Sequence, residues 1–242
     1  MTLAENAYQE IRRDIVEGLL PPGEPLRMAA LSERYGMAFS PLREALSRLQ
    51  SERLVVSVAM RGFSVTALSL PEMWDAMNTR VLIDAEALRL AIRRGDDAWE
   101  ADLVAAHHAL KLQAARVPRK TDDTRPLLET KHQEFHSALI AACGSKWLLD
   151  FSQKLYVETQ RYRHPTLTTS GDKGGRDVAG EHEQLMRATV ARDSKAACRL
   201  LREHLERTAH DLEARLNQAG DRVPMNLASR YEVAVARVTA GP

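Results

Sequence analysis

The chain has 242 residues, 44% of them hydrophobic, and its formal net charge is +1. No apolar run reaches the roughly 18–20 residues that a membrane-spanning helix needs, and the amphipathic N-terminus argues against a signal peptide. Two cysteines suit a reducing compartment, so we expect a cytoplasmic globular protein and exclude membrane and disulfide-rich secreted proteins.

Hydrophobic periodicity in the first 68 residues predicts three helices followed by a hairpin. The expected helices cover residues 6–18, 28–35 and the stretch that follows Ser40, and the expected strands cover residues 54–58 and 63–67. This order of elements is typical of a winged helix-turn-helix.

Local signals place the ends of these helices. The proline-rich residues 20–25 must end the first helix, because proline lacks a backbone donor, and Gly36 is suited to end the second. Ser40 is the expected N-cap of the third helix, with Pro41 at its first position.

From residue 71 onwards the pattern is helical almost to the end of the chain. The predicted helices cover residues 71–94, 97–115, 122–143, 146–163, 176–192 and 194–219. We therefore expect a mainly α protein with three parts: a winged helix-turn-helix (1–68), an all-helical antiparallel bundle with an internal cavity for a ligand or metal (69–219), and a C-terminal tail (220–242).

Several motifs resemble those of the GntR family of bacterial transcriptional regulators. Residues 19–26 and 35–49 resemble its helix-turn-helix region, and residues 61–65 resemble its wing. The helical part resembles the ligand-sensing FCD domain of the FadR branch, through residues 135–139 and 181–185, Arg192-Asp193, Leu201 and His204. Within that branch, residues 95–100, 147–151 and 155–163 look most like CsiR-type repressors, which act on genes of glutarate and related catabolism.

The recognition helix of such a domain places its N-terminal residues against base edges in the major groove. Arg43 is the expected guanine contact, and Arg61 beside Gly62 suits a wing that reaches the minor groove or the backbone. The full predicted DNA-binding set is Arg34, Phe39, Ser40, Pro41, Arg43, Arg48, Arg61 and Gly62. For each arginine, the alternative is a solvated surface residue.

The chain departs from the family pattern at two positions of this region. Phe39 and Ala29 stand where family members often carry arginine. The family's operator sequence therefore does not carry over, and Phe39 is a candidate for contact with a thymine methyl group.

Four histidines lie on apolar helical stripes, which is the most informative pattern of the C-terminal part. His132 and His136 are four residues apart and so share a helix face, while His182 and His204 lie on two later helices. Imidazoles that converge in a bundle can bind a divalent transition metal. The alternative for each ring is an ordinary hydrogen-bonded core histidine.

The order and spacing of these histidines resemble the metal-binding members of the family, which carry aspartate where this chain has His132. The resemblance thus implies His136, His182 and His204 as ligands and makes His132 a candidate fourth. The replacement of a carboxylate by imidazole favours zinc, with nickel or copper next, over manganese.

The CsiR-like motifs imply a small dicarboxylate or hydroxyacid effector. Arg80 stands where the family has a sensing arginine, although a salt bridge to Asp84 is an alternative role. Tyr156, Arg161 and Arg163 are second candidates for effector contacts.

The resulting expectation is a homodimeric repressor that binds palindromic operator DNA and is released by the effector, with residues 69–71 as the transmitting linker. One alternative is a regulator that responds to metal alone. A metal-dependent hydrolase is disfavoured, because Glu134 and Glu183 point away from the ligand faces and leave no general base.

Overall fold

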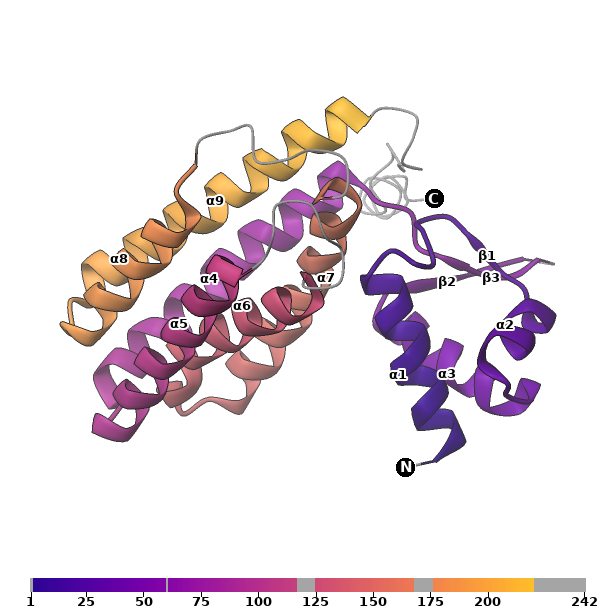
Figure 1. Cartoon of the computed structure of the whole chain (residues 1–242), viewed down its shortest axis with the longest axis horizontal. Helices are drawn as coiled ribbons and strands as arrows, with labels where there is room; N and C mark the ends of the chain where they lie inside the picture. Colours follow the sequence, from indigo (N-terminus) through magenta and orange to yellow (C-terminus); the bar gives the residue numbers. More distant parts are fainter. Residues whose placement is uncertain (1, 60, 117–124, 168–175, 220–242) are drawn as a thin grey trace, which may run out of the picture. The chain divides into compact units, whose positions relative to one another are not determined.

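The computed structural model describes residues 2–59, 61–116, 125–167 and 176–219, which are mainly helical with one small sheet (Figure 1). The predicted fold class, a winged helix-turn-helix followed by a helical bundle, is confirmed. The predicted tail, residues 220–242, lies outside the described residues. Among the described helices, none is both long and apolar enough to cross a membrane.

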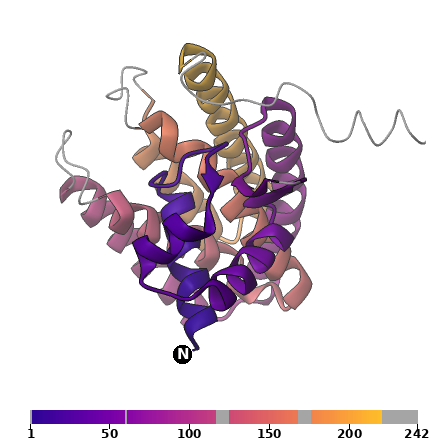
Figure 2. The same cartoon turned by 90° about the vertical axis from the view of Figure 1, so that its right-hand side faces the viewer.

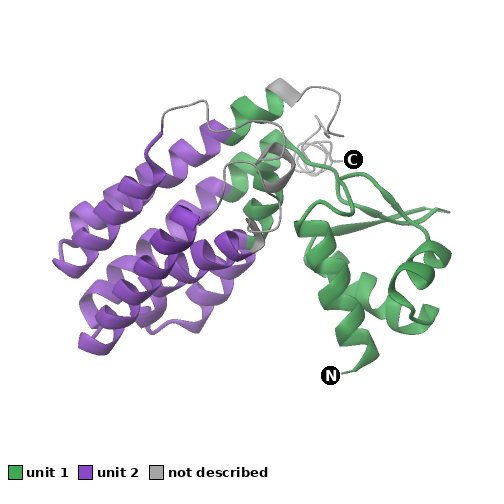
Figure 3. Ribbon diagram, in the orientation of Figure 1, with its two compact units in different colours: residues 1–76, 157–169, 212–242 green, residues 77–156, 170–211 purple. Residues whose placement is uncertain are grey.

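The chain divides into two compact units (Figure 3). Unit 1 comprises the described residues within 1–76, 157–169 and 212–242, and unit 2 comprises those within 77–156 and 170–211. Three long helices contribute turns to both units, so the boundary does not fall in a single loop.

Unit 1 contains the winged helix-turn-helix, which can be followed in Figures 1 and 2. Its elements are α1 (Leu3–Val16), β1 (Pro25–Leu26), α2 (Met28–Tyr35), α3 (Phe39–Ser51), β2 (Val55–Val58) and β3 (Gly62–Val65). The antiparallel sheet has the order β1-β3-β2, with Leu26 opposite Phe63 and Val56 opposite Ser64. Strand β1 was not predicted, because two residues are too few to show an alternating pattern.

The core of unit 1 forms where α1 packs on α3. Ile11, Leu42, Leu46 and Leu49 are fully buried there, as their helical spacing predicts. The predicted cap of α3 is wrong. The helix begins at Phe39 with Ala38 as N-cap and no side-chain cap, so Ser40 lies within the first turn.

Unit 2 is a bundle of roughly parallel and antiparallel helices. The helices of the C-terminal part are α4 (Leu70–Arg94), α5 (Asp97–Arg116), α6 (Arg125–Ile140) with the 3-10 turn η2 (Ala141–Cys143), α7 (Lys146–Leu167), α8 (Val178–Val190) and α9 (Ser194–Ala219). Helix α5 packs against α6 and α8, and the last turns of α7 and α9 belong to unit 1.

The turn between α8 and α9 is fixed to the end of α4. Arg192 has a left-handed backbone (φ 58°), and its guanidinium donates to the carbonyls of Ile92 and Gly95 at 3.0 and 2.9 Å. These carbonyls end α4 and would otherwise lack a partner within the helix. The contact holds α8 and α9, which carry two of the histidines, against α4.

Candidate functional site

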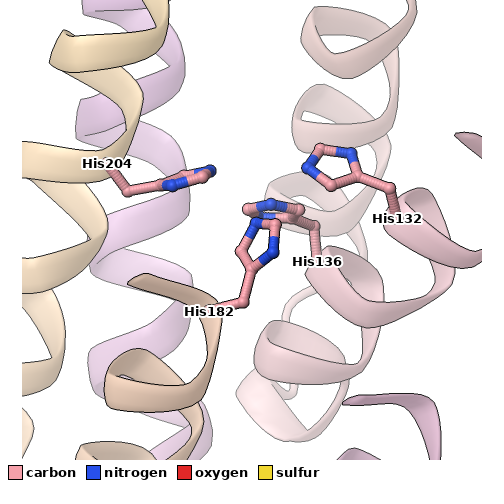
Figure 4. Close-up of side chains that lie close together, drawn as sticks. All are labelled: His132, His136, His182 and His204. Atoms are coloured by element: carbon pink, nitrogen blue, oxygen red, sulfur yellow. The ribbon is translucent and has the colours of Figure 1, made fainter. Parts of the chain in front are cut away.

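The structure brings together the four histidines that the sequence singled out. His132 and His136 project from α6, His182 from α8 and His204 from α9 (Figure 4). One ring nitrogen from each can be chosen so that all four atoms lie within 4.8 Å of one another. We refer to these four residues as the histidine cluster.

The burial of the cluster suits a metal ion. His136, His182 and His204 are 6%, 4% and 4% exposed, and the Nε2 atoms of His136 and His182 are buried without a hydrogen-bond partner among the described residues. Buried polar atoms nearly always have a hydrogen-bond partner. Two buried nitrogens without one, close together, are therefore expected where side chains bind a metal ion.

Burial also keeps the rings neutral. Desolvation lowers the pKa of His182 to about 2 and holds the pKa of His136 well below 6.5; neighbouring histidines and arginines lower both further, while Glu181 raises that of His182. The pKa of His204 is lowered chiefly by burial as well. A neutral imidazole offers the lone pair that a metal ligand needs.

Hydrogen bonds assign the tautomers of two rings. Nδ1 of His204 lies 2.8 Å from Oε2 of Glu181, and an ionised carboxylate only accepts, so this nitrogen carries the proton. The Tyr156 hydroxyl donates to Glu129 at 2.7 Å and therefore accepts from Nδ1 of His132 at 2.7 Å. Both rings are left with an Nε2 lone pair.

Glu181 is strongly ionised. Burial by itself would raise its pKa, but hydrogen bonds from Arg176, His204 and Arg207 outweigh burial and hold the pKa far below the ordinary value. The carboxylate thus remains an acceptor across the physiological range of pH.

Four imidazoles form a donor set of borderline softness, which suits zinc, nickel or copper and disfavours manganese or calcium. The residues present therefore fit a divalent transition metal. None of the four ligands would neutralise the charge of the ion, because none is a carboxylate.

Two predicted effector residues lie beside the cluster. The guanidinium carbon of Arg80 is 4.7 Å from the centre of the Tyr156 ring, and Arg80 is 1% exposed. The centre of the Tyr156 ring is in turn 6.0 Å from that of the His132 ring and 6.3 Å from that of the His136 ring. The expected alternative contact also forms, since Arg80 Nε donates to Asp84 at 3.0 Å.

Two further predicted effector residues, Arg161 and Arg163, lie on the part of α7 that belongs to unit 1. Arg161 is buried and its guanidinium donates to the carbonyls of Thr66 and Ala67, directly after the sheet. Its role here is to hold that segment of chain.

The predicted DNA-contacting residues lie on the surface of unit 1. Phe39 (51% exposed), Ser40 and Arg43 are exposed at the start of α3, and Pro41 is half-buried. Arg61 and Gly62 are exposed at the turn between β2 and β3, where Gly62 has a left-handed φ of 82°.

Arg34 and Arg48 are exposed as well, and each forms an ion pair within unit 1. Arg34 donates to buried Asp14 at 2.7 Å, and Arg48 donates to Glu5 at 2.7 Å above the ring of Tyr8. Without DNA, each of these guanidiniums is therefore already paired with a carboxylate.

Sequence reasoning missed Glu129, Arg176 and Glu181, which surround the histidine cluster. Each contacts a residue far along the chain, and helical periodicity reports only which residues share a face of one helix. The sequence pattern held no signal for these contacts.

Two family models match the chain. The model "Bacterial regulatory proteins, gntR family" matches residues 3–65, and the "FCD domain" model matches residues 75–207. The second match includes all four residues of the histidine cluster.

Relatives and solved structures agree with these matches. The chain is 40% identical over 205 residues to the uncharacterized HTH-type transcriptional regulator BphR of Paraburkholderia xenovorans (85% of this chain, 83% of BphR). It is 39% identical over 203 residues to the HTH-type transcriptional repressor GlaR of Escherichia coli (83% and 91%). The structure of Escherichia coli McbR/YncC is similar in fold, with a TM-score of 0.74 at 20% identity, covering 89% of this chain and 99% of that one.

Proposed function

Since the chain belongs to the gntR family of bacterial regulatory proteins and carries an FCD domain, we propose that it is a repressor whose affinity for operator DNA is set by a small carboxylate bound beside a metal ion in unit 2. A DNA-binding regulator follows from the family itself. The metal and the effector are the proposal.

The observation that carries the proposal is the histidine cluster with Arg80 and Tyr156 beside it. His132, His136, His182 and His204 would hold the ion, which supplies a Lewis-acidic point for a carboxylate oxygen. The four imidazoles do not offset the charge of the ion, and the guanidinium of Arg80, which is paired with Asp84 through Nε, lies nearby. This environment favours an anion. A dicarboxylate such as glutarate, or a hydroxyacid, has one group for the metal ion and a second for Arg80.

The proposed mechanism is a shift in population. An effector that binds one arrangement of the protein more tightly lowers the population of the DNA-binding arrangement by its differential binding energy. Operators of this family are read by dimers, so we also propose a homodimer that binds a palindrome with two recognition helices.

The test uses the full chain and a duplex that the protein itself selects from a random-sequence library. DNA affinity is measured after chelator treatment, with Zn²⁺ added, and with Zn²⁺ plus glutarate or another small carboxylate. The proposal expects a change in affinity that needs both. A full response to Zn²⁺ alone would favour the alternative of a metal-responsive regulator, which a complete four-histidine set allows. No response in any arm would overturn the proposal, and turnover of the carboxylate would indicate an enzyme.

Arg80→Ala separates the effector from the metal. We expect this variant to keep Zn²⁺ and DNA binding and to lose the response to the carboxylate. Arg93→Ala is the matched control, since Arg93 is an exposed residue of the same helix. A variant that responded like the wild type would remove Arg80 from the effector site.

A further inference from the structure

Glu181 lies one residue before His182 in α8, yet its carboxylate contacts His204 of α9. Its Oε2 atom is 2.8 Å from Nδ1 of His204, and the Glu181 side chain is only 13% exposed. One carboxylate therefore connects the two C-terminal helices that carry ligands, and it does so from outside the histidine cluster.

Arg176 fixes the orientation of that carboxylate. Its guanidinium donates to both oxygens of Glu181, at 2.9 and 2.5 Å, in the paired geometry that gives the strongest contacts of this kind. The same guanidinium donates to Asp211 at 2.8 Å and to the carbonyl of His204 at 3.0 Å. Glu181 is thus tied to α9 on two sides.

The fixed position of the Glu181 carboxylate determines the tautomer and the orientation of the His204 ring. The bond to Glu181 places the proton on Nδ1 and sets the plane of the ring, so Nε2 keeps its lone pair. Carboxylates behind metal-ligating histidines commonly act in this way, and they make the ring a better donor.

We propose that Glu181, held by Arg176, is the positioning residue that makes His204 a metal ligand. This inference rests on the proposed metal centre. It assigns a function to two residues outside the histidine cluster, and it explains why Arg176, just before α8, donates to both oxygens of Glu181.

The test compares Glu181→Gln with Glu183→Gln in the full chain. Glu183 lies on the same helix, but it pairs with Lys111 and Arg187. Competition with a chelating indicator gives the Zn²⁺ affinity, which we expect to fall about 10- to 100-fold in Glu181→Gln and to stay within about 2-fold of wild type in Glu183→Gln. Arg176→Lys keeps the charge but loses the two-pronged contact, so a smaller loss is expected.

A second readout needs no metal. Nitrogen chemical shifts of His204 in the chelator-treated protein report its tautomer, and we expect Nδ1–H in wild type and a shift toward Nε2–H in Glu181→Gln. Should Glu181→Gln fail to fold, Arg176→Lys provides both measurements.

The results that would contradict the metal centre differ from those that would contradict the role of Glu181. A wild-type protein that binds no Zn²⁺ would overturn the metal centre, and the role of Glu181 with it. Normal Zn²⁺ binding by wild type, together with equal affinities and equal tautomers in the Glu181 and Glu183 variants, would overturn the positioning role alone.

Discussion

The hydroxyl of Tyr156 lies 2.7 Å from Nδ1 of His132, and it donates a hydrogen bond to Glu129. The Tyr156 ring also lies beneath the guanidinium of Arg80. One side chain therefore touches both a candidate metal ligand and the candidate effector-binding arginine.

Tyr156→Phe keeps the ring under Arg80 and removes only the hydroxyl. Because His132 then loses the partner that holds its Nδ1 proton, we expect Zn²⁺ affinity to fall by about 10-fold, as for other outer contacts of metal ligands. A chelator competition titration measures the change. Tyr162→Phe, at a buried tyrosine of the same helix in unit 1, is the control and should bind Zn²⁺ like wild type.

Zn²⁺ should stabilise the folded protein, because the histidine cluster joins α6, α8 and α9 only when the chain is folded. At a free Zn²⁺ concentration 1,000 times the dissociation constant, we expect the free energy of unfolding to rise by about 4 kcal/mol. Chemical denaturation in metal buffers measures it. His182→Gln should lose most of the gain and the exposed His108→Gln should keep it; equal gains in all three proteins would contradict the proposed ligands.

Stability without metal should depend on pH in a defined direction. Burial lowers the pKa of His136, His182 and His204 below 6.5, so these rings stay neutral in the folded protein at pH values where the unfolded chain is protonated. Their contribution is present above about pH 6.5 and is lost as the pH falls towards the folded pKa values, which for His182 is about 2. In chelator-treated protein, we expect the free energy of unfolding to fall between pH 6.5 and 5, by up to about 1.4 kcal/mol per pH unit for each ring. Denaturant titrations at several pH values should show that the unfolding free energy of His182→Gln depends less steeply on pH than that of wild type. Identical slopes would show that the buried histidines do not cause the pH dependence.

Arg43→Ala should weaken DNA binding without affecting the fold, since Arg43 is exposed on the first turns of α3. Loss of a two-pronged guanine contact is worth about 1–3 kcal/mol, or about 5- to 150-fold in affinity. Fluorescence anisotropy with the selected duplex measures this loss, and preference at one base position should relax with it. Arg93→Ala, in the helical unit, serves as control; an unchanged affinity for Arg43→Ala would remove it from the interface.

Asp14→Ala should destabilise unit 1. The buried carboxylate of Asp14 accepts from Arg34 at 2.7 Å and from the Tyr35 hydroxyl at 2.9 Å, and it joins α1 to α2. Leaving these donors without their acceptor should cost about 1–3 kcal/mol of unfolding free energy. Denaturant unfolding with Glu33→Ala as the exposed control would test the estimate, and equal stabilities would show that the network contributes little.

Periodicity predicted much of the fold because the apolar residues of each helix report the side that is buried. The residues on the stripes of α6, α8 and α9 are those that meet inside the bundle, His132 and His204 included. Strand β1 escaped prediction because it is held by its pairing with β3, which its two residues do not encode locally.

Partners distant in sequence could not be predicted in the same way. Asp14 and Arg34 are separated by a proline-rich turn, and Glu181 reaches a helix that begins thirteen residues later. The start of α3 was misplaced for a different reason: Ser40 is a good capping residue by type, but the backbone had already turned helical at Phe39.

The residues that lead into the expected linker at 69–71 are held within unit 1. Thr66, Leu68 and Ser69 are 5%, 0% and 1% exposed, and Arg161 of α7 holds the carbonyls of Thr66 and Ala67. A buried segment that is hydrogen-bonded to a helix is less free to move independently of that helix than an exposed connection would be. Arg161 therefore bonds the chain that leaves the wing to the part of α7 that belongs to unit 1.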